Sequence, residues 1–537
     1  MRRLLSGCLL AGVLAAPLLA PTAHAANPKT ATPIKHIVII FGENRSFDHY
    51  FGTYPMALNP KGEPIFRALA NTPGVNGFSN ALLNNNPNLN PLNGSGATNP
   101  FRLSRSQANT ADMDHDYLAE QLAFDGGVMD LFPANTGSPG PPPGAPPAIV
   151  NTNGLVMGYF DGNTVTALWN YAQRFAMSDN SYSTNFGPST VGAINLVSGQ
   201  TNGVAKHTGG TGGLVRDGNG GWTVIGDPDP LGDVCSGSGQ VQMAGKNIGD
   251  LLNAAGISWG WFAGGFNLQI VNPDGSTGCD RQSTSTIVPE IGSQGDYSPH
   301  HTAFQYYAST ANPTHARPAS LQSIGWTDPA NHNYDIDDFY AAVTAGNFPA
   351  VSFLKAIRLQ DAHPGNSDPL DEQQFVVHVA NFLQAQPTWS STALIVLYDD
   401  SDGWYDHQLG QIVNPSKSPA DALTAPGACG NGAAAALPGV DPSTLHAQGR
   451  CGYGPRQPLL VISPWSKHNY VDHTVTDQTS VIRFIEDNWL GGQRIGQGSF
   501  DGIANSISSM FDFKQTISNV LYILNEKTGQ PVNTGSN

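Results

Sequence analysis

Two acidic side chains follow directly on one of the most apolar segments of this sequence. Leu394–Tyr398 is a run of mostly β-branched or aromatic residues, and it leads straight into Asp399 and Asp400. Such a run is typical of a strand that is buried on both faces. Adjacent carboxylates repel each other unless a cation lies between them, so this pair indicates a metal ion.

A second apolar segment, near the N-terminus, ends in the same way. His36–Phe41 is followed by Glu43 and Asn44. Taken alone, either turn is better explained by acids and amides that cap helices. Together the two turns predict the walls of one divalent-metal site, and their oxygen ligands favour a hard ion such as Mg²⁺, Ca²⁺ or Mn²⁺.

A hydroxyl group stands just before another apolar segment. Ser189 and Thr190 follow a Gly-Pro turn and precede 191–197, which has the pattern of an apolar helix. A hydroxyl at this position is usually an N-cap. It would equally suit a nucleophile, because the amides at a helix N-terminus stabilise an anion. The spacing leaves both interpretations open.

Histidines occur in polar surroundings at three places. His300 and His301 lie beside a proline in a polar loop, which favours binding to a metal or a phosphate over packing in a core. His115 lies among three aspartates, which would raise its pKa; it begins a helix or faces a phosphate. His363 follows the apolar segment 350–356, together with Asp361.

The elements that must position these residues alternate between strand and helix patterns. Polar residues gather at the ends of the expected strands, where ligands bind in open α/β sheets. This order predicts an α/β fold with a mostly parallel sheet. The expected strands are 36–41, 257–263, 350–356, 394–398 and 458–462. The expected helices are 118–124, 164–177, 191–197, 247–255, 334–345, 371–385 and one that is capped by 476–480 and runs through Trp489.

Composition narrows the class of protein. The chain has 537 residues and a formal net charge of −16, with no run of basic residues, which excludes a nucleic-acid scaffold and gives no attraction to anionic membranes. Its 61 glycines and 40 prolines indicate long ordered loops. We expect one elaborated domain over 26–537, with loop-rich insertions at about 60–150 and 200–350, and leave the oligomeric state open.

The N-terminus has the pattern of a secretory signal peptide. A basic start, an apolar run and Ala23-His24-Ala25 predict cleavage after Ala25, with no transmembrane anchor elsewhere. The four cysteines that remain suggest two disulfides in a secreted or periplasmic protein. Of the three possible pairings we expect Cys235–Cys279 and Cys429–Cys451, which close Gly-rich loops.

Several long motifs resemble one known family. In order along 33–490 they are GENRSFDHYFGTYP, NFGPSTVGAINLVSGQ, SPHHTAF, DAHP, YDDSDGWYDH and RQPLLVISPWSKHNYVDHTVTDQTSVIRFIE. They resemble the bacterial acid phosphatase/phospholipase C superfamily. The resemblance implies an alkaline-phosphatase-like α/β sandwich and a metal-dependent phosphoester hydrolase.

The same resemblance implies a role for individual positions. Ser189 would be the nucleophile, and a phosphoserine would be the intermediate. Two differences from many phospholipases, at 189–193 and at 399–407, resemble the acid phosphatase branch. The implied metal ligands are Glu43, Asn44, Ser189, Asp399 and Asp400; the implied phosphate-binding residues are His115, His300, His301 and His363, of which His115, His301 and His363 are also catalytic.

We therefore expect a secreted acid phosphomonoesterase with small phosphoesters as substrates. A phospholipase C that cleaves phosphodiester headgroups, such as that of phosphatidylcholine, is the alternative. A secreted binding protein with structural Ca²⁺ is a third possibility, but it leaves the serine and histidines unexplained. If protonated histidines bind the phosphate, activity should have an acidic optimum.

Overall fold

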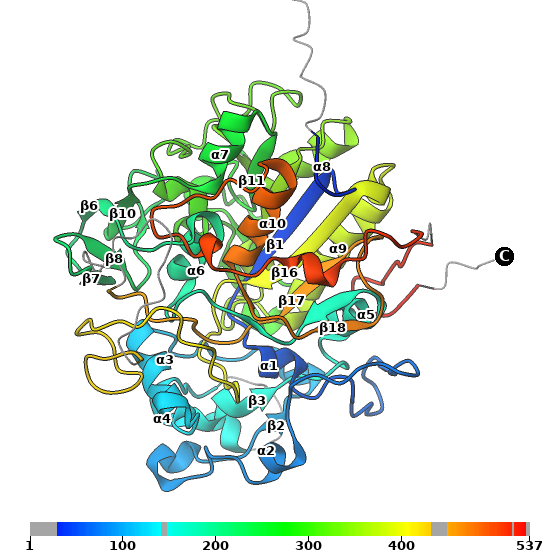
Figure 1. Cartoon of the computed structure of the whole chain (residues 1–537). Coiled ribbons are helices and arrows are strands. Elements are labelled where there is room, and N and C mark those ends of the chain that lie inside the picture. Colours follow the sequence, from blue (N-terminus) through cyan, green and yellow to red (C-terminus); the bar gives the residue numbers. More distant parts are fainter. Residues whose placement is uncertain (1–28, 141–147, 431–447, 518–519, 533–537) are drawn as a thin grey trace, which may run out of the picture.

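A computed structural model describes residues 29–140, 148–430, 448–517 and 520–532. The predicted signal peptide lies outside these residues. The core is an eight-stranded sheet in the order β14-β11-β15-β1-β16-β17-β4-β18 (Figure 1). Its strands are β14 (Asn333–Asp335), β11 (Trp259–Ala263), β15 (Val351–Lys355), β1 (His36–Gly42), β16 (Thr392–Tyr398), β17 (Leu459–Ile462), β4 (Ala176–Ser178) and β18 (Tyr470–Asp472).

The central strand β1 pairs in parallel with β15 on one side and β16 on the other. Its register places Gly42 opposite Tyr398, so Glu43 and Asp399 leave the sheet side by side. Because parallel strands end at one edge of a sheet, the two acidic turns that the sequence pointed to meet there.

One strand of this sheet runs against the others. β17 pairs antiparallel with both β16 and β4, whereas all other pairs in the sheet are parallel. The prediction of an α/β fold with a mostly parallel sheet is confirmed, and β17 makes the sheet mixed.

Helices cover both faces, as the alternation of β1 side chains requires. Val38 and Ile40 belong to one hydrophobic cluster, and Ile37 and Ile39 to the other. The first cluster is closed by α5 (Thr166–Arg174), α8 (Ile336–Thr344) and α9 (Pro369–Gln384), and the second by α6 (Ser189–Ser198), α7 (Ile248–Ala255) and α10 (Thr479–Trp489).

Short elements surround this core. These elements include four short helices: α1 (Phe47–Phe51), α2 (Asn80–Asn84), α3 (Tyr117–Phe124) and α4 (Phe132–Asn135). Three of them, α2, α3 and α4, lie at one end of the molecule (Figure 1). The remaining strands are β2 (Phe101–Arg102), β3 (Gly158–Tyr159), β5 (Ser181–Tyr182), β6 (Val204–Thr208), β7 (Leu214–Arg216), β8 (Trp222–Val224), β9 (Asp229–Pro230), β10 (Gln240–Met243), β12 (Gln282–Thr284), β13 (Ser293–Gly295) and β19 (Thr476–Asp477).

Two predicted helices were wrong at one end. The helix expected over 164–177 ends at Arg174, because Ala176–Ser178 joins the sheet as β4. The helix expected over 334–345 starts at Ile336, since 333–335 pair with β11 as β14. In both places strand pairing outweighs a helical pattern of apolar residues.

Both predicted disulfides are present. Cys235–Cys279 and Cys429–Cys451 have Cα–Cα distances of 5.4 and 5.8 Å, within the usual range. Among the described helices, none is both long and apolar enough to span a membrane.

Candidate active site

The Ser189 hydroxyl lies between two carboxylates at the carboxyl edge of the sheet. Its Oγ atom is 3.0 Å from Oε2 of Glu43 and 3.2 Å from Oδ2 of Asp400. All three side chains are buried. The structure thus brings together a serine from α6 and acids that follow β1 and β16, as the sequence predicted.

Ser189 is the first residue of α6 and does not cap the helix. Pro188 is the N-cap residue, and no side chain accepts a capping hydrogen bond there. The neighbouring Thr190 hydroxyl lies 3.2 Å from the Tyr306 hydroxyl instead of facing the acids. Of the two hydroxyls that the sequence left open, Ser189 is the one at the acidic cluster.

The side chains of Asp399 and Asn44 each use one polar atom for hydrogen bonds within the protein and leave the other free. Oδ1 of Asp399 accepts hydrogen bonds from the backbone N–H groups of Asn44 (2.9 Å) and Asp400 (2.7 Å). Asn44 donates through Nδ2 to Asp402 at 2.9 Å. Within the described part of the chain, no hydrogen bond reaches Oδ2 of Asp399 or Oδ1 of Asn44, although both are buried.

These free oxygens fit a divalent cation. Burial raises the pKa of Glu43 and of Asp400, and the neighbouring charge of Asp399 raises both further. Burial acts on Asp399 in the same direction, but the Glu43 carboxyl, Lys355 and two backbone amides outweigh it and lower its pKa. Buried acids that repel one another, with orphaned oxygens, are a donor set suited to Mg²⁺, Ca²⁺ or Mn²⁺.

A buried lysine that the sequence analysis did not single out also belongs to this cluster. The Lys355 ammonium at the end of β15 contacts Oε1 of Glu43 and lies 5.0 Å from the centre of the Phe41 ring. Burial alone would lower its pKa, but the charges of Glu43, Asp399 and Asp361 raise it above its usual value. The available signal was a basic residue inside an otherwise apolar strand.

Asp361 was noted only as a polar residue after β15, and it too faces the site. Its Oδ2 atom is 3.6 Å from Nδ1 of His301, and that nitrogen is 3.2 Å from Oε1 of Glu43. Glu43, His301 and Asp361 therefore form a group that could also hold a metal ion. The structure places His301 beside Glu43, and the sequence analysis assigned no role to Asp361.

Three histidines surround the space next to these acids. The ring centres of His115 and His363 are 6.3 Å apart, and those of His301 and His363 are 6.4 Å apart. Nε2 of His115 is 3.4 Å from the Asn44 side chain. His300 lies further out, 30% exposed, with Nδ1 3.5 Å from Asp229.

The charges of these histidines differ. Burial would lower the pKa of His115, but Asp400, Asp402 and Asp112 hold it well above its usual value. Burial lowers the pKa of His301 well below normal and that of His363 to about 4. These shifts favour a protonated His115 beside a neutral His301 and His363 when no ion is bound.

A buried glutamate braces the turns that carry the serine and the acids. Glu120 on α3 accepts hydrogen bonds from the Gly187 N–H at 2.9 Å and from the Ser401 hydroxyl at 2.7 Å. Gly187 lies two residues before Ser189, and Ser401 follows Asp400 directly. One side chain thus links the loop that precedes Ser189 to the acidic turn.

An α/β sheet whose edge holds a serine among acids and histidines is the architecture of a hydrolase site. The sequence profile of the phosphoesterase family matches residues 34–490. The chain belongs to this family.

Curated relatives are similar to the chain at low identity. A non-hemolytic phospholipase C of Burkholderia pseudomallei is 27% identical over 470 residues, which cover 86% of this chain and 56% of that protein. A non-hemolytic phospholipase C of Pseudomonas aeruginosa is 26% identical (85% and 54% covered), and phospholipase C A of Mycobacterium tuberculosis is 25% identical (90% and 78%). The chain spans just over half the length of the first two.

Two solved structures match more weakly. One is a protein of the alkaline phosphatase superfamily from Vibrio parahaemolyticus, with 13% identity, a TM-score of 0.27, and 80% of this chain and 81% of that chain covered. The other is murine ectonucleotide pyrophosphatase/phosphodiesterase 5, with 11% identity, a TM-score of 0.31, and 65% and 95% covered.

Proposed function

We propose that the protein is an exported, metal-dependent phosphoester hydrolase that acts on phosphomonoesters. The observation that carries the phosphoester hydrolase part of this proposal is the Ser189 hydroxyl, held between Glu43 and Asp400 near the free oxygens of Asp399 and Asn44. A phosphoryl centre is shielded by its own negative oxygens, so attack on it requires positive charge nearby. The described residues supply a donor set for that charge and a nucleophile within the same cluster.

Glu43, Asn44, Asp399 and Asp400 would hold the ion together with Ser189. A bound divalent ion would supply charge neutralisation for the phosphoryl oxygens and lower the pKa of the serine hydroxyl. Mg²⁺, Ca²⁺ and Mn²⁺ suit this oxygen set.

The side chains of the protein supply the remaining parts of the reaction. The Ser189 hydroxyl lies within hydrogen-bond distance of the carboxylates of Glu43 and Asp400, so one of them would take its proton as a lone pair of Oγ attacks phosphorus. The new Oγ–P bond forms as the bond from phosphorus to the leaving oxygen breaks, and protonated His115 donates its proton to that oxygen. Water, deprotonated by the now neutral His115, then attacks phosphorus; the Oγ–P bond breaks, the carboxylate returns its proton to Oγ, and phosphate is released.

A phospholipase C activity on phosphodiesters is the second candidate. It is favoured by the names of the curated relatives, which are phospholipases C at 24–27% identity. The monoester proposal rests instead on the sequence around 189–193 and 399–407, which resembles the acid phosphatase branch.

A paired assay separates the two candidates. The mature chain, 26–537, is tested on p-nitrophenyl phosphate and on p-nitrophenylphosphorylcholine, which share a leaving group. We expect the larger kcat/KM on the monoester. A larger value on the diester would replace the monoester proposal by the second candidate, and activity on neither would contradict both.

We also propose that the protein is exported. Two disulfides suit an oxidising compartment, the periplasm or the exterior of the cell. N-terminal sequencing of the protein recovered outside the cytoplasm should begin at Ala26.

A further inference from the structure

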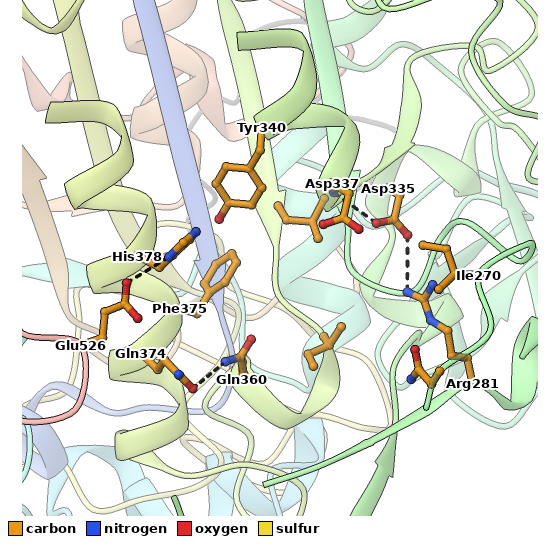
Figure 2. A pocket seen from close by; sticks show the side chains of 13 residues that line it. Ile270, Arg281, Asp335, Asp337, Tyr340, Gln360, Gln374, Phe375, His378 and Glu526 are labelled. Carbon is orange, nitrogen blue, oxygen red and sulfur yellow. Dashed lines mark hydrogen bonds and ion pairs between the residues drawn. The ribbon is translucent and has the colours of Figure 1, made fainter. Parts of the chain in front are cut away.

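A cavity of about 360 Å³ is lined by residues of α8 and α9 (Figure 2), and its lining does not include Ser189 or the acids around it. Its volume is in the range of small-molecule binding sites. Like the candidate active site, it opens near the carboxyl end of a sheet strand, since Asp335 closes β14. Its apolar wall is formed by Ile270, Ile336, Tyr340, Ile357 and Phe375.

Tyr340 in this wall packs against neighbouring aromatic rings. The Tyr340 ring packs edge-on against His378, with 5.3 Å between ring centres, and against Phe382, at 5.0 Å. Phe375 beside it is buried in α9. Figure 2 shows the Tyr340 side chain reaching from α8 toward the space above Phe375. Among the described residues, none forms a hydrogen bond with the Tyr340 hydroxyl.

The polar part of the wall carries an excess of negative charge. Asp335, Asp337 and Glu526 all line the cavity. Arg281, the arginine among the described residues that line the cavity, is already paired with Asp296 at 2.8 Å and lies 3.5 Å from Asp335. Its charge therefore does not offset the other carboxylates.

Two of these carboxylates lie close enough to Tyr340 to affect its pKa. The pKa of Tyr340 is raised by burial and further by the charges of Asp337 and Glu526. Glu526 is 3.0 Å from Nδ1 of His378 at the rim, whereas the Asp337 carboxylate has no ion-pair partner among the described residues. The cavity thus combines aromatic side chains with a solvent-exposed carboxylate that has no ion pair within the described part of the chain.

We propose that this cavity binds a small organic cation, an ammonium group carried on an apolar or aromatic body. Aromatic faces attract cations, and an ammonium ion near Asp337 would gain a charge partner that the protein does not supply. An apolar body would cover Ile336, Ile357 and Phe375. An anionic ligand would instead be repelled by the carboxylates of Asp337 and Glu526.

The cavity is distinct from the candidate active site but adjoins it along the chain. Ile357 and Gln360 line the cavity, and the same segment continues to Asp361 and His363. The inference does not depend on the proposed function, because no residue of the cavity wall takes part in the reaction described above.

Three probes of similar shape and different charge test the proposal. Benzylammonium, benzyl alcohol and benzoate are titrated into the full mature chain by calorimetry and by ligand-observed NMR at neutral pH. We expect saturable binding of benzylammonium, weaker binding of the alcohol and the weakest binding of benzoate. Equal affinities, the reverse order, or no saturable binding of benzylammonium up to tens of millimolar would overturn the proposal.

Variants locate the bound probe. Asp337→Asn should weaken benzylammonium binding about 2- to 5-fold, the size of an exposed ion pair, and leave benzyl alcohol unaffected. Tyr340→Leu should weaken both, and a circular-dichroism melt confirms that the variant is folded. Asp125→Asn, which removes an exposed charge at the end of α3, is the matched control.

A probe bound at the catalytic acids must also be distinguished. Ser189→Ala and saturating inorganic phosphate should leave benzylammonium binding unchanged. Competition by phosphate, combined with unaltered affinity in Asp337→Asn, would place the probe at the active site and overturn the proposal. Failure of the phosphoesterase assay would not affect these titrations.

Discussion

Gly192 packs so tightly against Asp399 that a Cβ atom on the glycine would lie 2.2 Å from the Asp399 carbonyl oxygen. The helix that carries Ser189 therefore touches the backbone of the turn that carries the acids, one helical turn beyond the serine. This close approach limits how near α6, and with it Ser189, can come to the acidic turn.

Replacing Gly192 by alanine should consequently be harmful. In an exposed helix the change would stabilise the protein by about 1 kcal/mol, but here it forces apart two backbone segments. We expect a loss of about 1–3 kcal/mol in the free energy of unfolding, measured in urea, and a lower kcat. Gly74→Ala, where a Cβ meets nothing within 4 Å, is the control. A stabilised, fully active Gly192→Ala would contradict the contact.

Ser189→Ala should lower the catalytic rate, whereas Thr190→Ala should mainly lower stability. Removal of the nucleophile should lower kcat on p-nitrophenyl phosphate by at least about 10³-fold. Thr190→Ala removes only the contact with Tyr306 and should cost about 1 kcal/mol of stability with little change in kcat. Single-turnover assays on both variants measure the loss of rate. A large loss in Thr190→Ala with little loss in Ser189→Ala would identify Thr190 as the nucleophile.

Chelation should destabilise the wild-type protein. A ligand present at 100 times its Kd stabilises the folded state by about 2.7 kcal/mol, so Tm should fall with EDTA and recover with Mg²⁺, Ca²⁺ or Mn²⁺. Asp399→Asn, which weakens the donor set, should reduce this metal-dependent shift in Tm. An identical shift in the variant would exclude Asp399 as a ligand.

Lys355→Met should destabilise the metal-free protein by about 3–5 kcal/mol, because it leaves buried Glu43 without its cation. Added divalent ion should restore part of the loss, since it neutralises the same carboxylate. Lys355→Arg retains the charge and should lose less. Urea unfolding with and without EDTA measures both effects, and equal stability of the methionine variant would show that Lys355 is not needed for charge balance.

The pH dependence of the rate should follow His115. Its pKa is raised, so the imidazolium form persists through neutral pH and is lost as pH rises through that higher value. We expect kcat/KM on the monoester to fall on this alkaline limb. His115→Asn should lower kcat/KM about 10²- to 10⁴-fold and remove the limb. A wild-type rate without an alkaline limb, or a limb that persists unchanged in His115→Asn, would contradict the assignment.

The sequence predicted the parts of this protein that depend on local pattern. The apolar runs before Glu43 and Asp399 were predicted as strands because the end of a buried strand can be recognised from its side chains alone. In the structure these two strands are parallel neighbours, and Ser189 lies beside the acids that follow them. The direction of β17 was not readable, since a short apolar strand looks the same in either orientation. Lys355 was missed for a related reason: a lysine inside an apolar strand has meaning only once its partner Glu43, from a distant segment, is known.

The site is assembled from residues that are far apart in the order of synthesis. Asn44 binds Asp399 across 355 residues of chain. At ribosomal rates of 5–20 residues per second, the N-terminal wall of the site exists for roughly 20–70 s before its counterpart is made. A nascent chain that stops before β16 has Glu43 and Ser189 but no partner strand to close the site. Catalytic competence therefore appears late, after most of the polypeptide has left the ribosome.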